Sequence, residues 1–163
     1  MSATTTGPAS AGAAASGAAT GMPDLLYGEA ETELRAAVRA LFSGRSGWRE
    51  VLARTETPET YDAGLWRALA ADVGCAGLLI PESNGGAGAS YREAAVVAEE
   101  TGRAVAPVPY LGSAVVATTA LLAAGDDQLL TALADGVVTA ALAVPFATAP
   151  GASETPASAA RTA

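Results

Sequence analysis

Histidine and lysine are both missing from the 163 residues of this chain, and cysteine occurs once. Without histidine, the chain cannot form a Ser-His-Asp triad, a Cys-His pair or a histidine-ligated metal site. Without lysine, a Schiff base and the phosphate-binding lysine of a P-loop are excluded as well. The single Cys75 can form no internal disulfide, which is compatible with a reducing compartment, and we expect it to be a small buried apolar residue.

Positive charge is also scarce. Nine arginines face 17 acidic residues, so the net charge is −8, which argues against nucleic acid and anionic membranes as partners. The apolar stretch 111–124 is shorter than the roughly 20 residues that span a bilayer. The N-terminus has neither the basic start nor the leucine-rich segment of a secretory signal, so we expect no membrane segment and a cytoplasmic location.

Both ends of the chain consist mostly of small residues. Residues 1–21 are almost all Ala, Gly, Ser and Thr, and residues 146–163 are similar. Such segments have too little apolar bulk to offset the entropy lost on ordering, so we expect a disordered leader and a disordered tail. Met22 stands where the leader ends, which leaves open whether translation begins at Met1 or Met22.

Between these ends, apolar residues recur with helical periodicity. Leu34, Val38, Leu41 and Phe42 share one helical face, and similar stripes follow along the chain. The pattern predicts an orthogonal bundle of about six helices, an all-α domain over 22–136. The expected helices cover about 29–42, 48–54, 63–73, 90–102, 109–125 and 127–134.

Capping residues support several of these boundaries. Asp62 and Asp126 are typical N-caps, and Ser90 with Glu93 forms a capping box. Gly44 is expected to end the first helix. Gly74 is placed to end the third helix in the left-handed conformation.

Two further segments are predicted outside the helices. Residues 77–81 are expected to be extended, with a Gly-rich loop at 82–89. Residues 137–145 are predicted to form a strand. Because one strand cannot satisfy its own backbone groups, it either pairs with something outside the predicted elements or is not a strand.

The possible site motifs have simpler explanations. Gly86-Ala87-Gly88 fails the dinucleotide-binding pattern, because Tyr91 stands where a third glycine is needed. Glu99 and Glu100 have the spacing of a surface ion pair with Arg103. The apolar stripe of the fifth helix is interpreted as core; it consists of Val115, Val116, Leu121 and Leu122.

The order of these features resembles the N-terminal domain of acyl-CoA dehydrogenases over about residues 22–145. The most specific part is Gly-Leu-Leu-Ile-Pro-Glu at 77–82 followed by Gly-Gly-Ala-Gly-Ala-Ser at 85–90. Leu-Arg-Ala-Ala-Val-Arg at 34–39 and Ala-Glu-Glu-Thr-Gly-Arg at 98–103 flank it. Asn84 departs from the pattern, because family members often carry an aromatic residue before the paired glycines.

The resemblance implies FAD-dependent α,β-dehydrogenation of an acyl-CoA thioester. It also implies that strand 137–145 is the first strand of a middle β domain, which a C-terminal helical bundle follows. Those two domains supply most flavin contacts and the catalytic glutamate. No residue of this chain matches that glutamate, so no catalytic residue is assigned and no metal is expected. By the same similarity, Tyr110, Gly112 and Val116 are candidates for one wall of the acyl pocket.

Three hypotheses follow from the resemblance and its limits. The chain is a truncated or frame-shifted dehydrogenase that is inactive alone, or a non-catalytic subunit that docks on a complete dehydrogenase-like chain. The third possibility is a helical interaction module with no acyl-CoA role. A homo- or hetero-oligomer with dehydrogenase-like chains is compatible with the first two.

Overall fold

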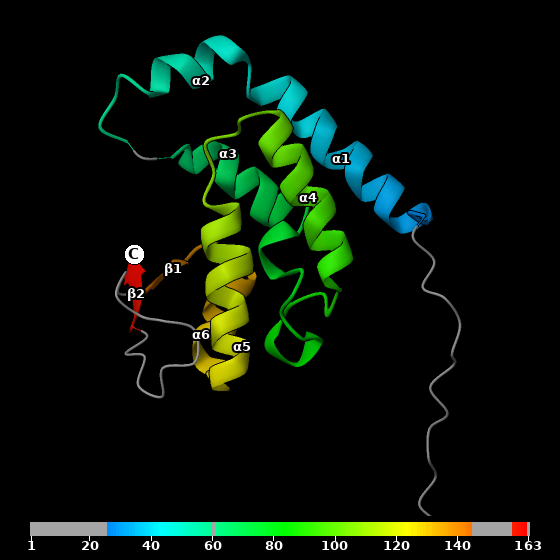
Figure 1. The fold of residues 1–163 in the computed structure, drawn as a ribbon, viewed down its shortest axis with the longest axis vertical. Helices are drawn as coiled ribbons and strands as arrows, with labels where there is room; N and C mark the ends of the chain where they lie inside the picture. Colours follow the sequence, from blue (N-terminus) through cyan, green and yellow to red (C-terminus); the bar gives the residue numbers. More distant parts are fainter. Residues whose placement is uncertain (1–25, 60, 145–157, 163) are drawn as a thin grey trace, which may run out of the picture.

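The computed structural model describes residues 26–59 and 61–144, together with the backbone of 158–162. The predicted leader, the possible start at Met22 and most of the predicted tail lie outside these residues. All six predicted helices are present (Figure 1). They are α1 (Glu29–Arg45), α2 (Trp48–Arg54), α3 (Ala63–Arg67) continued by η1 (Ala68–Asp72), α4 (Tyr91–Arg103), η4 (Tyr110–Ala117) continued by α5 (Thr118–Ala124), and α6 (Asp127–Ala134).

The helices pack as an all-α bundle, as predicted. Helix α1 lies along α4, and the α5–η4 rod packs against α6 and the strand β1 (Thr139–Ala143) (Figure 1). One hydrophobic cluster fills the space between α1, α3, α4 and η4, and Val38, Phe42, Trp66 and Leu69 belong to it. A smaller cluster around Ile80 joins α5 and α6. Burial of these apolar side chains is the main favourable contribution to folding.

Local sequence signals set most helix ends. Asp62 and Asp126 each accept a hydrogen bond from a backbone N–H of the first turn, and Ser90 forms the expected capping box with Glu93. Gly74 adopts φ +76°, a left-handed conformation that glycine tolerates. These predictions are confirmed. Gly44, however, lies inside α1, which runs on to Arg45, so the prediction that this glycine stops the helix was wrong.

Residues 77–81 are not the extended segment that the sequence predicted. They follow a short 3₁₀ turn, η2 (Cys75–Gly77), and a second such turn, η3 (Glu82–Asn84), comes directly after them. The segment bends because the Gly-rich loop folds back on it: Gly88 donates to the Ile80 carbonyl at 2.8 Å and Ala89 to the Leu78 carbonyl at 2.7 Å. The apolar side chains of 78–80 are buried, Leu78 in the larger hydrophobic cluster and Ile80 in the smaller one.

Strand β1 pairs antiparallel with β2 (Ser158–Thr162), with Ala141 opposite Ala160. The sequence predicted only the first of these strands and placed 158–162 in a disordered tail, whereas the structure pairs this segment with β1. Its residues are mostly small and carry no alternating apolar pattern, so nothing local marked it as a strand. Among the described residues, no helix has the length and apolarity needed to cross a membrane.

Two helical stretches are π-helical, which the sequence did not reveal. In η1 the Val73 N–H donates to the Ala68 carbonyl, five residues back. At the end of η4, both the backbone N–H and the hydroxyl of Thr118 donate to the Ser113 carbonyl, again five residues back. Such π-helical turns are rare in proteins overall, but those that occur often lie at functional sites. This makes η4 a candidate position for a functional site.

Candidate functional site

The π-helix η4 presents an open apolar surface on one side. We define the η4 face as Leu111, Gly112, Val116 and Thr119, with the neighbouring Tyr91. Gly112, Val116 and Thr119 follow one another at i, i+4 and i+7, which places them on one side of the helix. Leu111 is 61% exposed and Val116 is 41% exposed. A Cβ at Gly112 would meet nothing within 4 Å, so the surface has a gap between its apolar side chains.

Two hydroxyl groups stand at the edge of this face. The Thr119 hydroxyl donates to the Val115 carbonyl at 2.6 Å, and it lies 3.0 Å from the Tyr91 hydroxyl. Since a threonine hydroxyl has one proton, Tyr91 is the donor of the second bond. This leaves the phenol with acceptor capacity only. The η4 face therefore combines apolar contact area with one weak polar edge.

The three residues suggested by the sequence do not all share this surface. Gly112 and Val116 lie on the η4 face. Tyr110, in contrast, is 1% exposed, and its hydroxyl donates to the Ala94 carbonyl on α4. Burial raises the pKa of Tyr110 above its ordinary value. Its packing fixes the first turn of η4 against α4 and so holds the η4 face in place.

The far side of η4 is tied to strand β1. Ser113 is buried, and its hydroxyl accepts a hydrogen bond from the Ala140 N–H at 3.0 Å. The Trp66 indole N–H donates to the Gly136 carbonyl at 2.8 Å, just before the strand. These bonds link η4, α3 and β1, so the orientation of the η4 face depends on the strand.

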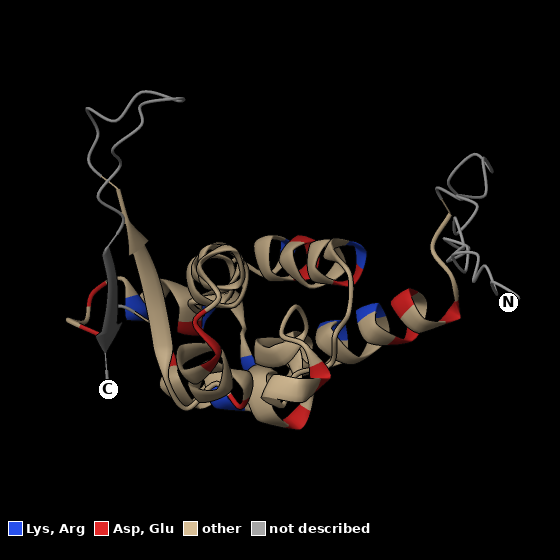
Figure 2. Cartoon of the chain, turned by 90° about the horizontal axis from the view of Figure 1, so that it is seen from below, with Lys and Arg blue, Asp and Glu red and all other residues tan. Residues whose placement is uncertain are grey.

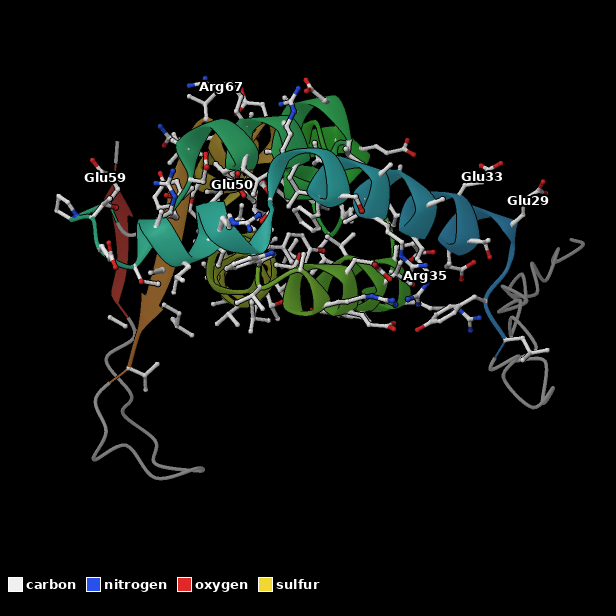
Figure 3. The ribbon with its side chains drawn as sticks, turned by 90° about the horizontal axis from the view of Figure 1, so that it is seen from above. Glu29, Glu33, Arg35, Glu50, Glu59 and Arg67 are labelled. Atoms are coloured by element: carbon white, nitrogen blue, oxygen red, sulfur yellow. The ribbon has the colours of Figure 1, made fainter. Side chains whose placement is uncertain are left out.

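A buried charge cluster joins α1 to α4, and the sequence analysis missed it. Glu100 is 2% exposed and accepts hydrogen bonds from Arg35 and from Arg39, which contacts it with two nitrogens at 2.9 and 2.6 Å. Arg35 points across to α4 in Figure 3 and also pairs with Glu99. Figure 2 shows how the charged residues of α1 follow one another along that helix.

The prediction that Glu100 belongs to a solvated ion pair with Arg103 was wrong. Its partners come from 61 and 65 residues earlier in the chain, so spacing within α4 could not reveal them. Hydrogen bonds from Arg39, and then from Arg35, lower the pKa of Glu100 and keep it ionised. Cys75, by contrast, is fully buried as predicted, and burial raises its pKa to about 12. Its thiol is therefore unsuited to nucleophilic chemistry.

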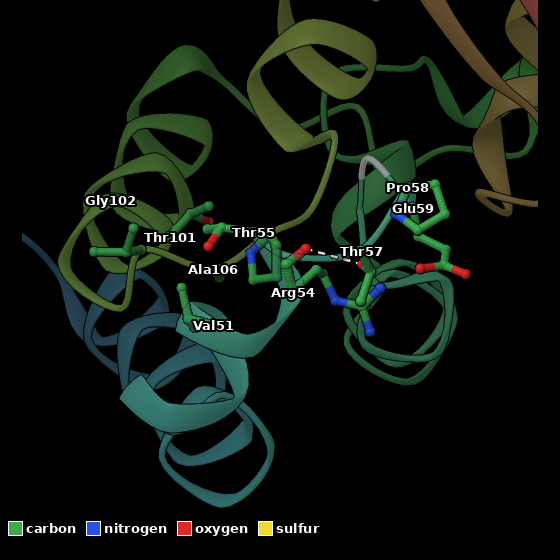
Figure 4. A pocket seen from close by; sticks show the side chains of 11 residues that line it. Val51, Arg54, Thr55, Thr57, Pro58, Glu59, Thr101, Gly102 and Ala106 are labelled. Atoms are coloured by element: carbon green, nitrogen blue, oxygen red, sulfur yellow. Dashed lines mark hydrogen bonds between the residues drawn. The ribbon is translucent and has the colours of Figure 1, made fainter.

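A cavity of about 600 Å³ lies between α2, the segment that follows it and the end of α4 (Figure 4). Its lining includes Val51, Thr55, Thr101 and Val105. Arg54 lines it too, but this guanidinium is already paired with Asp62 at 3.0 Å. The described part of the chain has no group of three or more metal-ligating side chains. The cavity therefore combines apolar contact area with the Arg54 guanidinium and the Glu59 carboxylate.

Few buried polar side-chain groups of the described residues are free to contact a flavin. Among their fully buried side-chain nitrogen and oxygen atoms, the Ser46 hydroxyl is the single one without a partner. It lies between α1 and α2 and lines the cavities there, not the η4 face. On the η4 face, the polar groups of Tyr91 and Thr119 bond to each other. On the η4 face itself, neither hydroxyl therefore has a free donor for a flavin.

Comparison with known proteins identifies the domain. The family model described as acyl-CoA dehydrogenase, N-terminal domain, matches residues 28–139. The chain belongs to the acyl-CoA dehydrogenase family. Two family members, both named acyl-CoA dehydrogenase IpdE2, are 45% identical to it over 111 and 103 residues. They come from Mycobacterium tuberculosis and Mycolicibacterium smegmatis, and the matches cover 67% and 63% of this chain.

These matches account for only part of the relatives. They cover 35% and 33% of the two IpdE2 proteins, so the chain spans about a third of their length. A solved structure of a variant of the Tcur3481-Tcur3483 steroid ACAD is similar, with a TM-score of 0.60 and 35% sequence identity. That similarity covers 66% of this chain and 30% of the other. The acyl-CoA dehydrogenase N-terminal fold is thereby established for this chain.

Proposed function

We propose that this chain supplies the helical domain of an FAD-dependent acyl-CoA dehydrogenase and that its η4 face forms one wall of the acyl pocket. The observation that carries the proposal is the open apolar surface of Leu111, Gly112 and Val116 on a π-helix, in a domain of this family. The reaction is the α,β-dehydrogenation of an acyl-CoA thioester. FAD is the hydride acceptor, and it is held by domains beyond this one.

In this proposal the chain has a positioning role. Gly112 and Val116 contact the acyl group, and Tyr110 sets their position from the core through its bond to Ala94. In this proposal the catalytic base lies in another domain of the family, and the buried Glu100 is engaged by two arginines of α1. The chain alone is therefore expected to be inactive.

A domain exchange tests the proposal. Residues 26–144 would replace the matching segment of the Mycobacterium tuberculosis relative, and dehydrogenation of acyl-CoA substrates would be followed with an artificial electron acceptor. We expect an active chimera in which Val116→Asp raises KM at least about tenfold, because a carboxylate in an apolar wall is desolvated against the acyl group. Ala37→Asp, which introduces the same carboxylate at an exposed position of α1, is the control. Equal KM values for the two variants would refute an acyl-wall role.

The alternative function is a non-catalytic subunit that docks on a complete dehydrogenase-like chain. It is favoured by the similarity to the steroid ACAD whose name joins two components, Tcur3481 and Tcur3483. Co-expression with a dehydrogenase-like chain and size-exclusion chromatography distinguish the two functions. Stable co-elution with retained activity supports the subunit, and separate elution argues for a domain that acts only within its own longer polypeptide.

A further inference from the structure

Helix α2 has no buried residue, although it contains Trp48, Val51 and Leu52. Trp48 is 68% exposed and Leu52 is 58% exposed, and their i, i+4 spacing aligns them as one ridge. The helix is only seven residues long. Helices this short are marginal in water unless an apolar face is packed. The outer face of α2 is therefore available for packing by another molecule.

A groove runs beside this ridge. Two cavities, of about 510 and 600 Å³, lie between α2 and the end of α4 and share Val51, Thr55 and Val105 in their linings. Leu52 forms one side of the smaller cavity, and Val105, 68% exposed, forms the other. Ridge and groove belong to the same surface, which we call the α2 patch: Trp48, Val51, Leu52, Thr55 and Val105. Such a surface offers both a protruding and a recessed apolar part to a second copy.

Val105 occupies its place at an energetic cost. It has φ +47°, and the N–H groups of Val105 and Ala106 donate to the Gly102 and Thr101 carbonyls, the usual bonds at the end of a helix. Glycine is the common residue here, because left-handed backbone is strained for a β-branched side chain. In this chain the position instead carries a valine whose side chain is in water. Contact with another molecule would bury that side chain.

The charges along α2 suit a second copy of the same helix. Arg49 and Leu52 follow at i and i+3 on α2, and Glu56 lies in the turn directly after the helix. The positive charge thus precedes Leu52 and the negative charge follows it. A two-fold axis beside Leu52 sets two copies of α2 antiparallel and brings the Arg49 end of each copy to the Glu56 end of the other. The Arg49 guanidinium already lies 4.5 Å from the centroid of the Trp48 ring, which orders it at the edge of the patch.

We propose that two copies of this chain associate through the α2 patch, with α2 packed antiparallel on its counterpart and Leu52 at the two-fold axis. In such an isologous contact, each patch supplies the ridge for the groove of the other. Reciprocal Arg49–Glu56 pairs flank the apolar centre. The chain carries a net charge of −8, so this local match is what allows two copies to approach at this face. The proposal is independent of any acyl-CoA role.

Sedimentation equilibrium of the full chain is the first test. We expect the mass to rise with concentration from the 15.9 kDa monomer to twice that value. Leu52→Glu is expected to raise the dimer Kd at least about tenfold, since it places two carboxylates at the symmetry axis. Leu111→Glu changes a leucine of similar exposure on the η4 face and is the matched control. Far-UV circular dichroism of each variant verifies that the fold is intact.

A charge exchange is the sharper test. Arg49→Glu sets two glutamates opposite each other, and Glu56→Arg does the same with two arginines, so each variant alone is expected to be monomeric. An equimolar mixture of the two variants brings opposite charges together again across the interface and is expected to dimerise. Arg67→Glu, which lies on α3 and points away from α2 in Figure 3, is expected to have no effect.

Several results would overturn the proposal. A chain that stays monomeric at every concentration has no such interface. A dimer that survives Leu52→Glu but is dispersed by Leu111→Glu forms through the η4 face instead. Failure of the mixed charge variants to associate, when the unmodified chain dimerises, would show that the helices do not meet antiparallel at Leu52.

Discussion

At the scale of single residues, Glu100 holds α1 against α4 through Arg35 and Arg39. We expect Glu100→Gln to lower the free energy of unfolding by about 2 kcal/mol. Removing one partner of a fully buried pair costs roughly 3–5 kcal/mol, but these arginines retain access to water, with exposures of 19% and 47%. Urea denaturation measures the change. Glu99→Gln, at a side chain that is 55% exposed, is the control and should have a clearly smaller effect, because solvent screens its ion pair.

The same carboxylates make stability depend on pH. Hydrogen bonds from arginines lower the pKa of Glu99 and Glu100 below the ordinary 4.5 in the folded chain. Their contribution is fully present above that ordinary value and is lost as the pH falls through the folded pKa values. The thermal unfolding midpoint should therefore decrease as the pH is lowered from about 4.5. The fall should be shallower in Glu100→Gln, and an equal slope in both proteins would exclude Glu100 as a source.

Gly86 has no room for a side chain. A Cβ there would lie 2.6 Å from the Gly77 carbonyl oxygen and closer still to that of Ile80. We expect Gly86→Ala to destabilise the fold by about 2 kcal/mol or more in urea denaturation, because the obstructing atoms are backbone. At Gly102 in α4 a Cβ would meet nothing within 4 Å, so Gly102→Ala should stabilise by up to about 1 kcal/mol. Similar effects at both positions would contradict this account.

Residue-scale features divide clearly into those that the sequence predicts and those that it does not. Asp62, Ser90 and Asp126 act on backbone groups two or three residues away, so their capping roles follow from local spacing. The burial of Glu100 depends on Arg35 and Arg39, which only the packing of α1 on α4 brings near it. A local pattern carries no information about such a contact.

At the scale of elements, η4 and β1 are coupled through Ser113. We expect Ser113→Ala to accelerate hydrogen exchange of the Ala140 amide about fivefold, since loss of the Ser113–Ala140 bond leaves that amide unpaired and one such bond contributes about 1 kcal/mol. Exchange followed by mass spectrometry or NMR checks this, with the amides of α4 as the internal reference. Unchanged exchange at Ala140 would mean that the strand is held by other contacts.

The boundaries and types of the helices also divide into those that local sequence predicts and those that it does not. Helices 48–54 and 127–134 were predicted from end to end, and Asp126 marks the start of the second one locally. The π-helical turns were not, since one additional residue per turn leaves no trace in the apolar pattern. For the candidate site, the sequence suggested Tyr110, Gly112 and Val116. The hydroxyl pair of Tyr91 and Thr119 could not be predicted, because it depends on how α5 lies beside α4.

At the scale of the whole molecule, the chain carries the N-terminal fold of the acyl-CoA dehydrogenase family and spans about a third of the length of its IpdE2 relatives. The domain presents two separate apolar surfaces. We propose that the η4 face contacts an acyl group and that the α2 patch contacts a second copy of the chain. Each surface can be altered without touching the buried clusters, so the two roles are separable by substitution.

The visible absorption spectrum of the purified chain, recorded with added FAD after removal of unbound flavin, tests the central claim most directly. The claim is that this domain shapes an acyl pocket and leaves flavin binding and proton abstraction to other domains. The account predicts a colourless protein. A retained flavin spectrum that bleaches when an acyl-CoA is added would show that the chain builds a complete active site and would contradict the account.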